Sequence, residues 1–233
     1  MAGQMVSNSA PAMEQMPMAA TSSVMNEDMF FYRLPAVTLD QGERGHYVIQ
    51  EIKCPYEHLY TWDADSPDVW HSLSFTNGNS APLTTGTGTT YKNGEILGQD
   101  TLSYTAAGGK GLLRITKAMD IGTQSGEEEV SRERITLRYS STSEIPFDYV
   151  TTKGTLVIRN SKSEPVKMSI TKSVLGEVIA SDNDGKVTKT RRDPRTVNQP
   201  YQEDWANPRS QIAWTMTLAP LESKTITYTY KVY

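Results

Sequence analysis

The chain has 233 residues, with 23 basic and 27 acidic side chains and a formal net charge of −4. This modest negative charge offers no general attraction to phosphate backbones, so we expect no nucleic-acid partner. The single cysteine, Cys54, excludes an intrachain disulfide and any zinc site built from several cysteines. Because no apolar run approaches the roughly 18 residues that span a bilayer, we also expect no membrane span.

Residues 1–28 are rich in Met, Ala, Ser, Gln and Pro, and they contain no aromatic residue. A segment of this composition cannot bury enough apolar surface to offset the entropy lost on ordering. We therefore expect residues 1–28 to form a disordered low-complexity leader.

From residue 29 onward, short β-type runs alternate with turn residues, and no helical period persists over three turns. In the stretch TTYKNGEILGQDTLSYT, Asn93 and Gly94 lie between two strand-like segments. Asn-Gly favours the positive φ angles of a type I′ turn, so this stretch predicts a β-hairpin.

The second half of the chain shows the clearest alternation of apolar and polar residues. A period of two indicates β-strands with one buried face. A turn over 160–165 separates two such runs, and a turn around Pro220 separates the two runs of the C-terminal segment. The predicted inward residues are Leu156, Ile158, Met168, Ile170, Trp214, Met216, Leu218, Ile226 and Tyr228.

These patterns predict an all-β protein with two antiparallel β-sandwich-like units, residues 29–143 and 144–233, behind the leader. The C-terminal unit is expected to be immunoglobulin- or fibronectin-like. The length suits two units of roughly 100 residues each.

The polar segment 181–211 predicts a long excursion between strands, and such loops often carry binding functions. This segment contains basic residues followed by two aromatic residues. They predict either a loop that binds an acidic protein or a polysaccharide, or an ordinary solvated loop. They are Lys186, Lys189, Arg191, Arg192, Arg195, Tyr201 and Trp205.

The three histidines, His46, His58 and His71, lie near several carboxylates in the sequence. Imidazole and carboxylate groups are ligands for zinc or copper. The candidate metal ligands are His58, His71 and Asp63, although their spacing matches no familiar metal motif. Ordinary structural histidines in aromatic strands are the alternative interpretation.

Other candidate sites have simpler explanations. The D-x-D-x-x-D run of Asp63, Asp65 and Asp68 lacks the glycine and the distal glutamate of a calcium-binding EF-hand loop. The Asp182–Gly185 stretch is typical of an Asx turn. On a strand, Cys54 and His58 would lie roughly 13 Å apart, too far for proton transfer unless the chain folds back at Pro55. Residues 127–129, all glutamates, suggest a solvated loop.

No G-x-S-x-G nucleophile motif and no phosphate-binding loop occur in the sequence. These observations favour a non-catalytic protein over an enzyme, and we expect no cofactor.

Three stretches carry a resemblance to a known family: SLSFTNGNSAPLTTGTGTTYKNGEILGQDTLSYTAAGGKGLLRITKAMDI over 72–121, GTLVIRNSKSEPVKMSITKSVLGEV, and WTMTLAPLESKTITYTYKVY. With them, the chain resembles the domain family of unknown function in the C-terminal part of bacterial mucoidy-inhibitor-A-like proteins. The likeness covers most of residues 29–233. It implies an all-β fold and a periplasmic, envelope-associated or secreted location, and it offers no established active site.

We therefore expect a non-catalytic structural or interaction domain of a bacterial envelope-associated protein. It would bind a protein or polysaccharide, or assemble into a homo-oligomer, through loops and strand edges. Self-assembly through the terminal strand, residues 224–233, is one version of this hypothesis. The alternative is a metal-binding protein or metal-dependent hydrolase centred on His58 and His71.

Overall fold

The computed structural model describes residues 22–26, 29–33, 36–138, 144–190 and 207–232, and every regular element in these ranges is a β-strand. The all-β prediction is thereby confirmed. The strands are β1 (Ser22–Asn26), β2 (Met29–Arg33), β3 (Tyr56–Asp63), β4 (Val69–Thr76), β5 (Gly86–Lys92), β6 (Glu95–Leu102), β7 (Lys110–Lys117), β8 (Ile121–Arg138), β9 (Glu144–Asn160), β10 (Val166–Leu175), β11 (Glu177–Ser181), β12 (Lys186–Thr190), β13 (Arg209–Leu218) and β14 (Ser223–Val232). Within those ranges no helix is long and apolar enough to cross a membrane.

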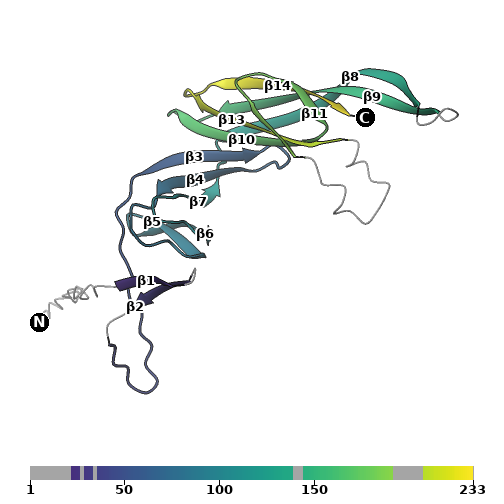
Figure 1. The fold of residues 1–233 in the computed structure, drawn as a ribbon. Helices are drawn as coiled ribbons and strands as arrows, with labels where there is room; N and C mark the ends of the chain where they lie inside the picture. Colours follow the sequence, from purple (N-terminus) through teal and green to yellow (C-terminus); the bar gives the residue numbers. More distant parts are fainter. Residues whose placement is uncertain (1–21, 27–28, 34–35, 139–143, 191–206, 233) are drawn as a thin grey trace, which may run out of the picture.

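The strands form two large sheets and two hairpins (Figure 1). The six-stranded sheet has the order β12-β13-β10-β3-β4-β7, and the four-stranded sheet has the order β11-β14-β9-β8. Most neighbouring strands are antiparallel, whereas β10 and β3 are parallel. The hairpins β1–β2 and β5–β6 lie toward the N-terminal end of the molecule (Figure 1).

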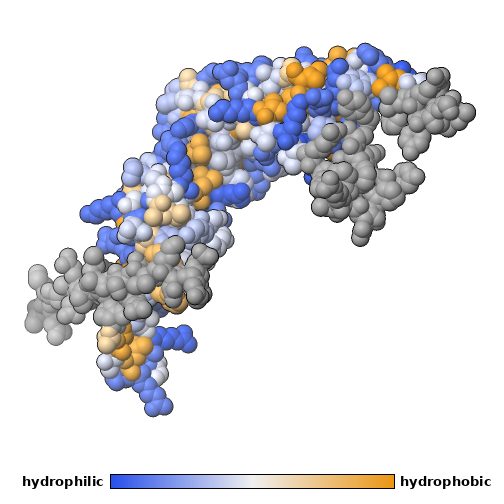
Figure 2. Space-filling view, viewed as in Figure 1, coloured by the Kyte–Doolittle hydropathy of each residue, from blue (hydrophilic) through white to orange (hydrophobic). Residues whose placement is uncertain are grey.

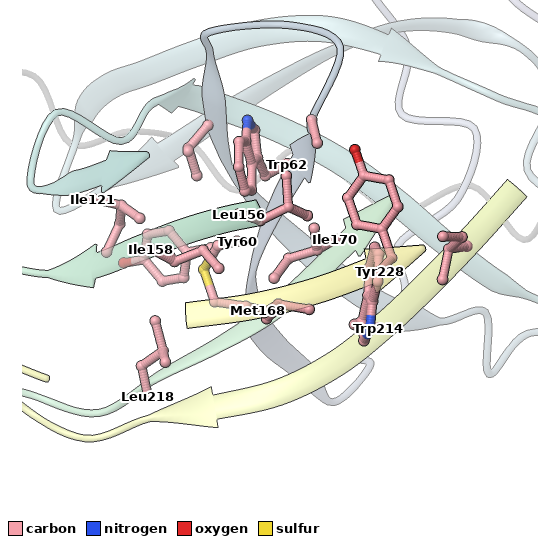
Figure 3. Close-up of a cluster of buried hydrophobic side chains, with 14 of the residues drawn as sticks. Tyr60, Trp62, Ile121, Leu156, Ile158, Met168, Ile170, Trp214, Leu218 and Tyr228 are labelled. Carbon is pink, nitrogen blue, oxygen red and sulfur yellow. The ribbon is translucent and has the colours of Figure 1, made fainter. Parts of the chain in front are cut away.

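Side chains from the two large sheets meet in one hydrophobic core (Figure 3). All the predicted inward residues are buried except Met216, which packs against the core while partly buried. Tyr60 and Trp62 from β3 and Ile121 from β8 also belong to this core. Burying a large apolar side chain contributes about 1.5–3 kcal/mol, so this cluster is the main source of stability.

The two large sheets do not follow the expected division into residues 29–143 and 144–233. The hairpin of β8 and β9 spans that boundary, with paired residues from Ile121 with Asn160 to Arg138 with Glu144. In the six-stranded sheet, β10 pairs with β3, so strands from both expected units share one sheet. Alternation shows which face of a strand is buried, but it does not reveal which strand lies beside it.

Two buried asparagines organise equivalent turns. The Nδ2 group of Asn160 donates hydrogen bonds to the carbonyl oxygens of Glu164 and Ala219, both at 2.9 Å. Its Oδ1 accepts a hydrogen bond from the backbone N–H of Lys162 at 3.0 Å. Asn77 makes the corresponding contacts in the turn after β4. Each side chain therefore ties its own turn to a turn that is distant in sequence.

The predicted hairpin at Asn93-Gly94 is confirmed, because these residues join β5 to β6 with φ angles of 52° and 84°. The expected leader lies mostly outside the described residues, but its segment Ser22–Asn26 forms β1 and pairs with β2. The expected excursion over 181–211 contains β12, while residues 191–206 lie outside the described part of the chain.

The terminal strand β14 is an interior strand of its sheet. It pairs with β9 from Ser223 to Val232 and with β11 on its other side. On the β11 side this pairing covers only residues 228–231, so self-assembly through residues 224–233 stays a prediction, and it would have to leave or displace β11. Removing this strand would also take Ile226 and Tyr228 out of the core.

Candidate functional site

His58 and His71 form a pair on neighbouring strands. In the register of β3 and β4, His71 lies opposite Tyr60 and His58 lies opposite Leu73, so the two imidazoles are diagonal neighbours on one sheet face. The distance from His58 Nδ1 to His71 Nε2 is 2.8 Å, which is a hydrogen bond between the rings. The two candidate ligands His58 and His71 are thus neighbours in the structure, and metal binding by them stays a prediction.

Aromatic rings hold both imidazoles. Tyr60 stacks on His71 with a centroid distance of 4.7 Å and an interplanar angle of 8°. The ring of Tyr56 meets His58 edge-on at 5.7 Å. Burial lowers the pKa of His71, and electrostatic interactions with His58 and Lys162 lower it further. This lowered pKa favours the neutral form of the His71 imidazole.

The third predicted ligand, Asp63, does not join the pair. It lies at the far end of β3, opposite Thr171 of β10 and away from the imidazoles. Its Oδ1 accepts a hydrogen bond from the backbone N–H of Asp65 at 3.2 Å. Among the residues that the structure describes, no group of three or more histidine, cysteine or acidic side chains is close enough to hold a metal ion.

The remaining acidic candidates have partners within the protein. Asp68 pairs with Lys117 at 2.6 Å. Both carboxylate oxygens of Asp182 accept hydrogen bonds from Thr227, one from its backbone N–H at 2.9 Å and one from its hydroxyl at 3.0 Å. These carboxylates connect loops to strands, which is a structural role.

A polar cluster that the sequence did not reveal joins the two large sheets. Tyr228 and Tyr230 of β14 donate hydrogen bonds to Glu127 of β8, at 2.6 Å and 2.9 Å. Lys172 of β10 lies 3.2 Å from Glu127 and 2.6 Å from Asp65. We call these five residues the Glu127 cluster. The sequence predicted a solvated loop here, because residues 127–129 are all glutamates. Nothing in that run distinguishes Glu127, which contacts the two tyrosines, from its neighbours.

The Glu127 cluster keeps its carboxylate ionised. Partial burial alone would raise the pKa of Glu127, but hydrogen bonds from Tyr228 and Tyr230 and the charge of Lys172 outweigh it and lower the pKa. A carboxyl whose pKa falls on folding adds stability above its unfolded pKa. That stability is lost as the pH falls through the lower, folded value.

The substitution Glu127→Gln should therefore lower the free energy of unfolding by about 1–2 kcal/mol at about pH 7. The difference from the unsubstituted protein should shrink in acid, as the pH falls through the lowered pKa of folded Glu127 and the carboxyl becomes protonated in both states. Urea unfolding at several pH values measures this. The exposed neighbour Glu128 supplies the control Glu128→Gln, and equal losses for both variants at all pH values would refute the role of the cluster.

The second candidate surface is a groove on the outer face of the six-stranded sheet, opposite the core. Thr61 lies opposite Trp70 and Ser169, and Thr171 lies opposite Asp63. On β3, Thr61 and Asp63 alternate with Tyr60 and Trp62, which face the core, so Thr61 and Asp63 point outward. Their partners on the neighbouring strands lie on the same outer face. The groove has a volume of about 460 Å³ and is lined by Thr61, Trp62, Asp63, Ser66, Asp68, Trp70, Leu112, Arg114, Ser169 and Thr171.

Polar groups in the outer-face groove are available to a ligand. Within the described residues, the hydroxyls of Thr61, Ser169 and Thr171 make no hydrogen bond. The guanidinium of Arg114 lies 5.1 Å from the centre of the half-buried Trp70 ring. An indole and several unpaired polar groups thus meet in one groove, from β3, β4, β7 and β10.

Exposed apolar residues gather elsewhere, on the segment between β2 and β3, as Figure 2 shows at the N-terminal end of the molecule. They are Val37, Leu39, Tyr47, Val48 and Ile49. His46 belongs to the same segment and is exposed, so it lies outside the strands that carry His58 and His71. The three histidines of the sequence therefore separate into one pair and one lone residue.

Comparison with known proteins identifies no relative of this chain. The chain matches no protein-family model, and no curated protein or solved structure is significantly similar to it.

Proposed function

We propose that this chain is a non-catalytic interaction domain of a bacterial envelope-associated protein, and that it binds a polysaccharide in the outer-face groove. The observation that carries the proposal is the combination of the Trp70 indole with unpaired hydroxyls in one groove. The bacterial and envelope setting rests on the resemblance to mucoidy-inhibitor-A-like proteins. The two facing sheets also support an immunoglobulin- or fibronectin-like class for the C-terminal part.

The groove suits the chemistry of a sugar. A sugar ring presents hydroxyls that both donate and accept hydrogen bonds, together with an apolar face of C–H groups. Thr61, Ser169 and Thr171 can both donate and accept, while Arg114 only donates. Trp70 supplies a flat apolar surface beside them. The volume of about 460 Å³ lies within the range of small-molecule sites.

The strand edges suit a partner less well than the groove does. The outer strand β8 carries a bulge between Glu129 and Ser131, and Arg132 pairs with Glu129 and Asp148. At the other sheet, the edge strand β12 is short and carries Lys186 and Lys189. Bulges and charges of this kind hinder pairing with a further strand. The outer face of the six-stranded sheet is therefore the proposed binding surface, in place of the strand edges.

The proposal is tested by measuring saccharide binding. The purified chain is applied to an array of neutral and acidic bacterial oligosaccharides, and each positive ligand is titrated by calorimetry. Trp70→Ala should weaken binding at least tenfold, about 1.4 kcal/mol, because the apolar surface is lost. Thr171→Val, which keeps the shape and removes a hydroxyl, should weaken binding less while leaving the fold intact.

Tyr91→Ala is the matched control, because this aromatic residue is 61% exposed on β5 and lies outside the groove. Its binding should equal that of the unsubstituted chain. Failure to bind any saccharide, or unchanged binding in both groove variants, would overturn the proposal. Release of shorter saccharides would also contradict it, since the domain would then be a hydrolase.

A further inference from the structure

We propose that His58 Nδ1 and His71 Nε2 together bind one divalent transition-metal ion of the zinc, copper or nickel class. The site lies on the sheet face opposite the groove, so the inference is independent of the proposed saccharide binding. Imidazole nitrogens are good ligands for these ions, whereas calcium and magnesium prefer oxygen.

The spacing of the two nitrogens is close to that of two ligands on one metal ion. Zinc binds imidazole nitrogen at about 2.0–2.1 Å, so two tetrahedral ligands lie about 3.3 Å apart. Ligands at right angles lie about 2.9 Å apart. The observed distance between the two nitrogens is 2.8 Å. Small side-chain rotations that separate the nitrogens by a few tenths of an ångström would therefore bring them to the spacing of two ligands on one ion.

The proton between the rings does not prevent binding. A hydrogen bond between two neutral imidazoles requires one ring to carry its hydrogen on the shared side. When that hydrogen moves to the other nitrogen of the same ring through solvent exchange, both facing nitrogens present a lone pair. The step changes only the tautomer, so the charge of the pair stays the same until the cation arrives.

The surroundings hold the ligands in place and accept a positive charge. The stacked Tyr60 ring and the edge of Tyr56 restrict both imidazoles. Lys162, which interacts electrostatically with His71, is paired with Asp120 at 3.3 Å, which offsets its charge. His58 is exposed, so water can complete the coordination of the ion. Two protein ligands and open water positions make this a site of moderate affinity.

Calorimetric titration of the tag-free chain with Zn²⁺, Ni²⁺ and Cu²⁺ tests the inference. We expect one ion per chain, and at least tenfold weaker binding, about 1.4 kcal/mol, in His58→Gln and in His71→Gln. The matched control is His46→Gln, which changes the one histidine outside the pair and should bind as the unsubstituted chain does.

Urea unfolding of each variant checks that the fold is kept. If His58→Gln is unstable, His58→Asn offers a shorter amide that cannot reach His71. Three outcomes would overturn the inference: no binding of the three ions, binding unchanged in both pair variants, or binding lost in the His46→Gln variant.

Discussion

Trp214→Ala should lower the free energy of unfolding by about 4 kcal/mol, the largest effect we expect from any single substitution. Trp214 is 1% exposed and lies 6.1 Å from the ring of Tyr228, at the contact between the two large sheets. Its indole N–H donates a hydrogen bond to the Asp182 carbonyl oxygen at 3.0 Å. The substitution removes this bond and leaves a cavity that the surrounding strands cannot close.

Urea unfolding measures the effect as a lower urea concentration at the midpoint of the transition. The slope of the unfolding free energy against urea concentration should stay unchanged. Trp214→Phe keeps an aromatic ring and should lose less, about 1–2 kcal/mol. The exposed Met119, which is 89% accessible, supplies the control Met119→Ala, with a change within about 0.5 kcal/mol. A loss below about 1 kcal/mol in Trp214→Ala would mean that the two sheets do not share this core.

Asn160→Ala should lower the free energy of unfolding by about 3 kcal/mol. The side chain is fully buried and makes three hydrogen bonds, two as donor and one as acceptor. Alanine would leave the carbonyl oxygens of Glu164 and Ala219 without their donor inside the protein. Each buried acceptor left unpaired costs about 1–3 kcal/mol, so the turns before β10 and before β14 should separate together.

A pair of further variants distinguishes the hydrogen bonds of Asn160 from simple loss of volume. Asn160→Asp keeps the shape and the acceptor but replaces the donor with a buried carboxylate oxygen, so it should destabilise the protein at least as much as alanine does. The exposed amide Gln124 on β8 supplies the control Gln124→Ala, for which little change is expected. A mild effect of Asn160→Asp would show that the two donated bonds are unimportant.

Periodicity predicted the strands and the inward residues because both depend on local alternation. Leu156, Ile158, Ile170 and Trp214 could be assigned to the core in this way. The partners of each strand could not be predicted, because pairing such as β10 with β3 joins segments far apart in sequence. For the same reason, the sequence did not reveal that strands from both sides of residue 143 share sheets.

The candidate sites differ in how much the sequence revealed. His58 and His71 were named together because imidazoles are metal ligands and the two lie near carboxylates in the sequence, and the structure places them on neighbouring strands. The carboxylate chosen with them, Asp63, was placed by proximity in sequence, and the extended strand carries it away from the imidazoles. Residues of the outer-face groove, such as Trp70 and Ser169, come from four strands, so no local pattern could bring them together.

Nuclear magnetic resonance mapping tests most directly whether the outer-face groove is the binding surface. An isotope-labelled chain is titrated with a saccharide that binds it, and the backbone amide shifts are followed to saturation. We expect the largest shifts at Thr61, Trp70, Ser169 and Thr171, with little change at the buried Ile158. Shifts confined to β12, to residues 36–55 or to the strands of the four-stranded sheet would contradict this function, since the ligand would then bind elsewhere.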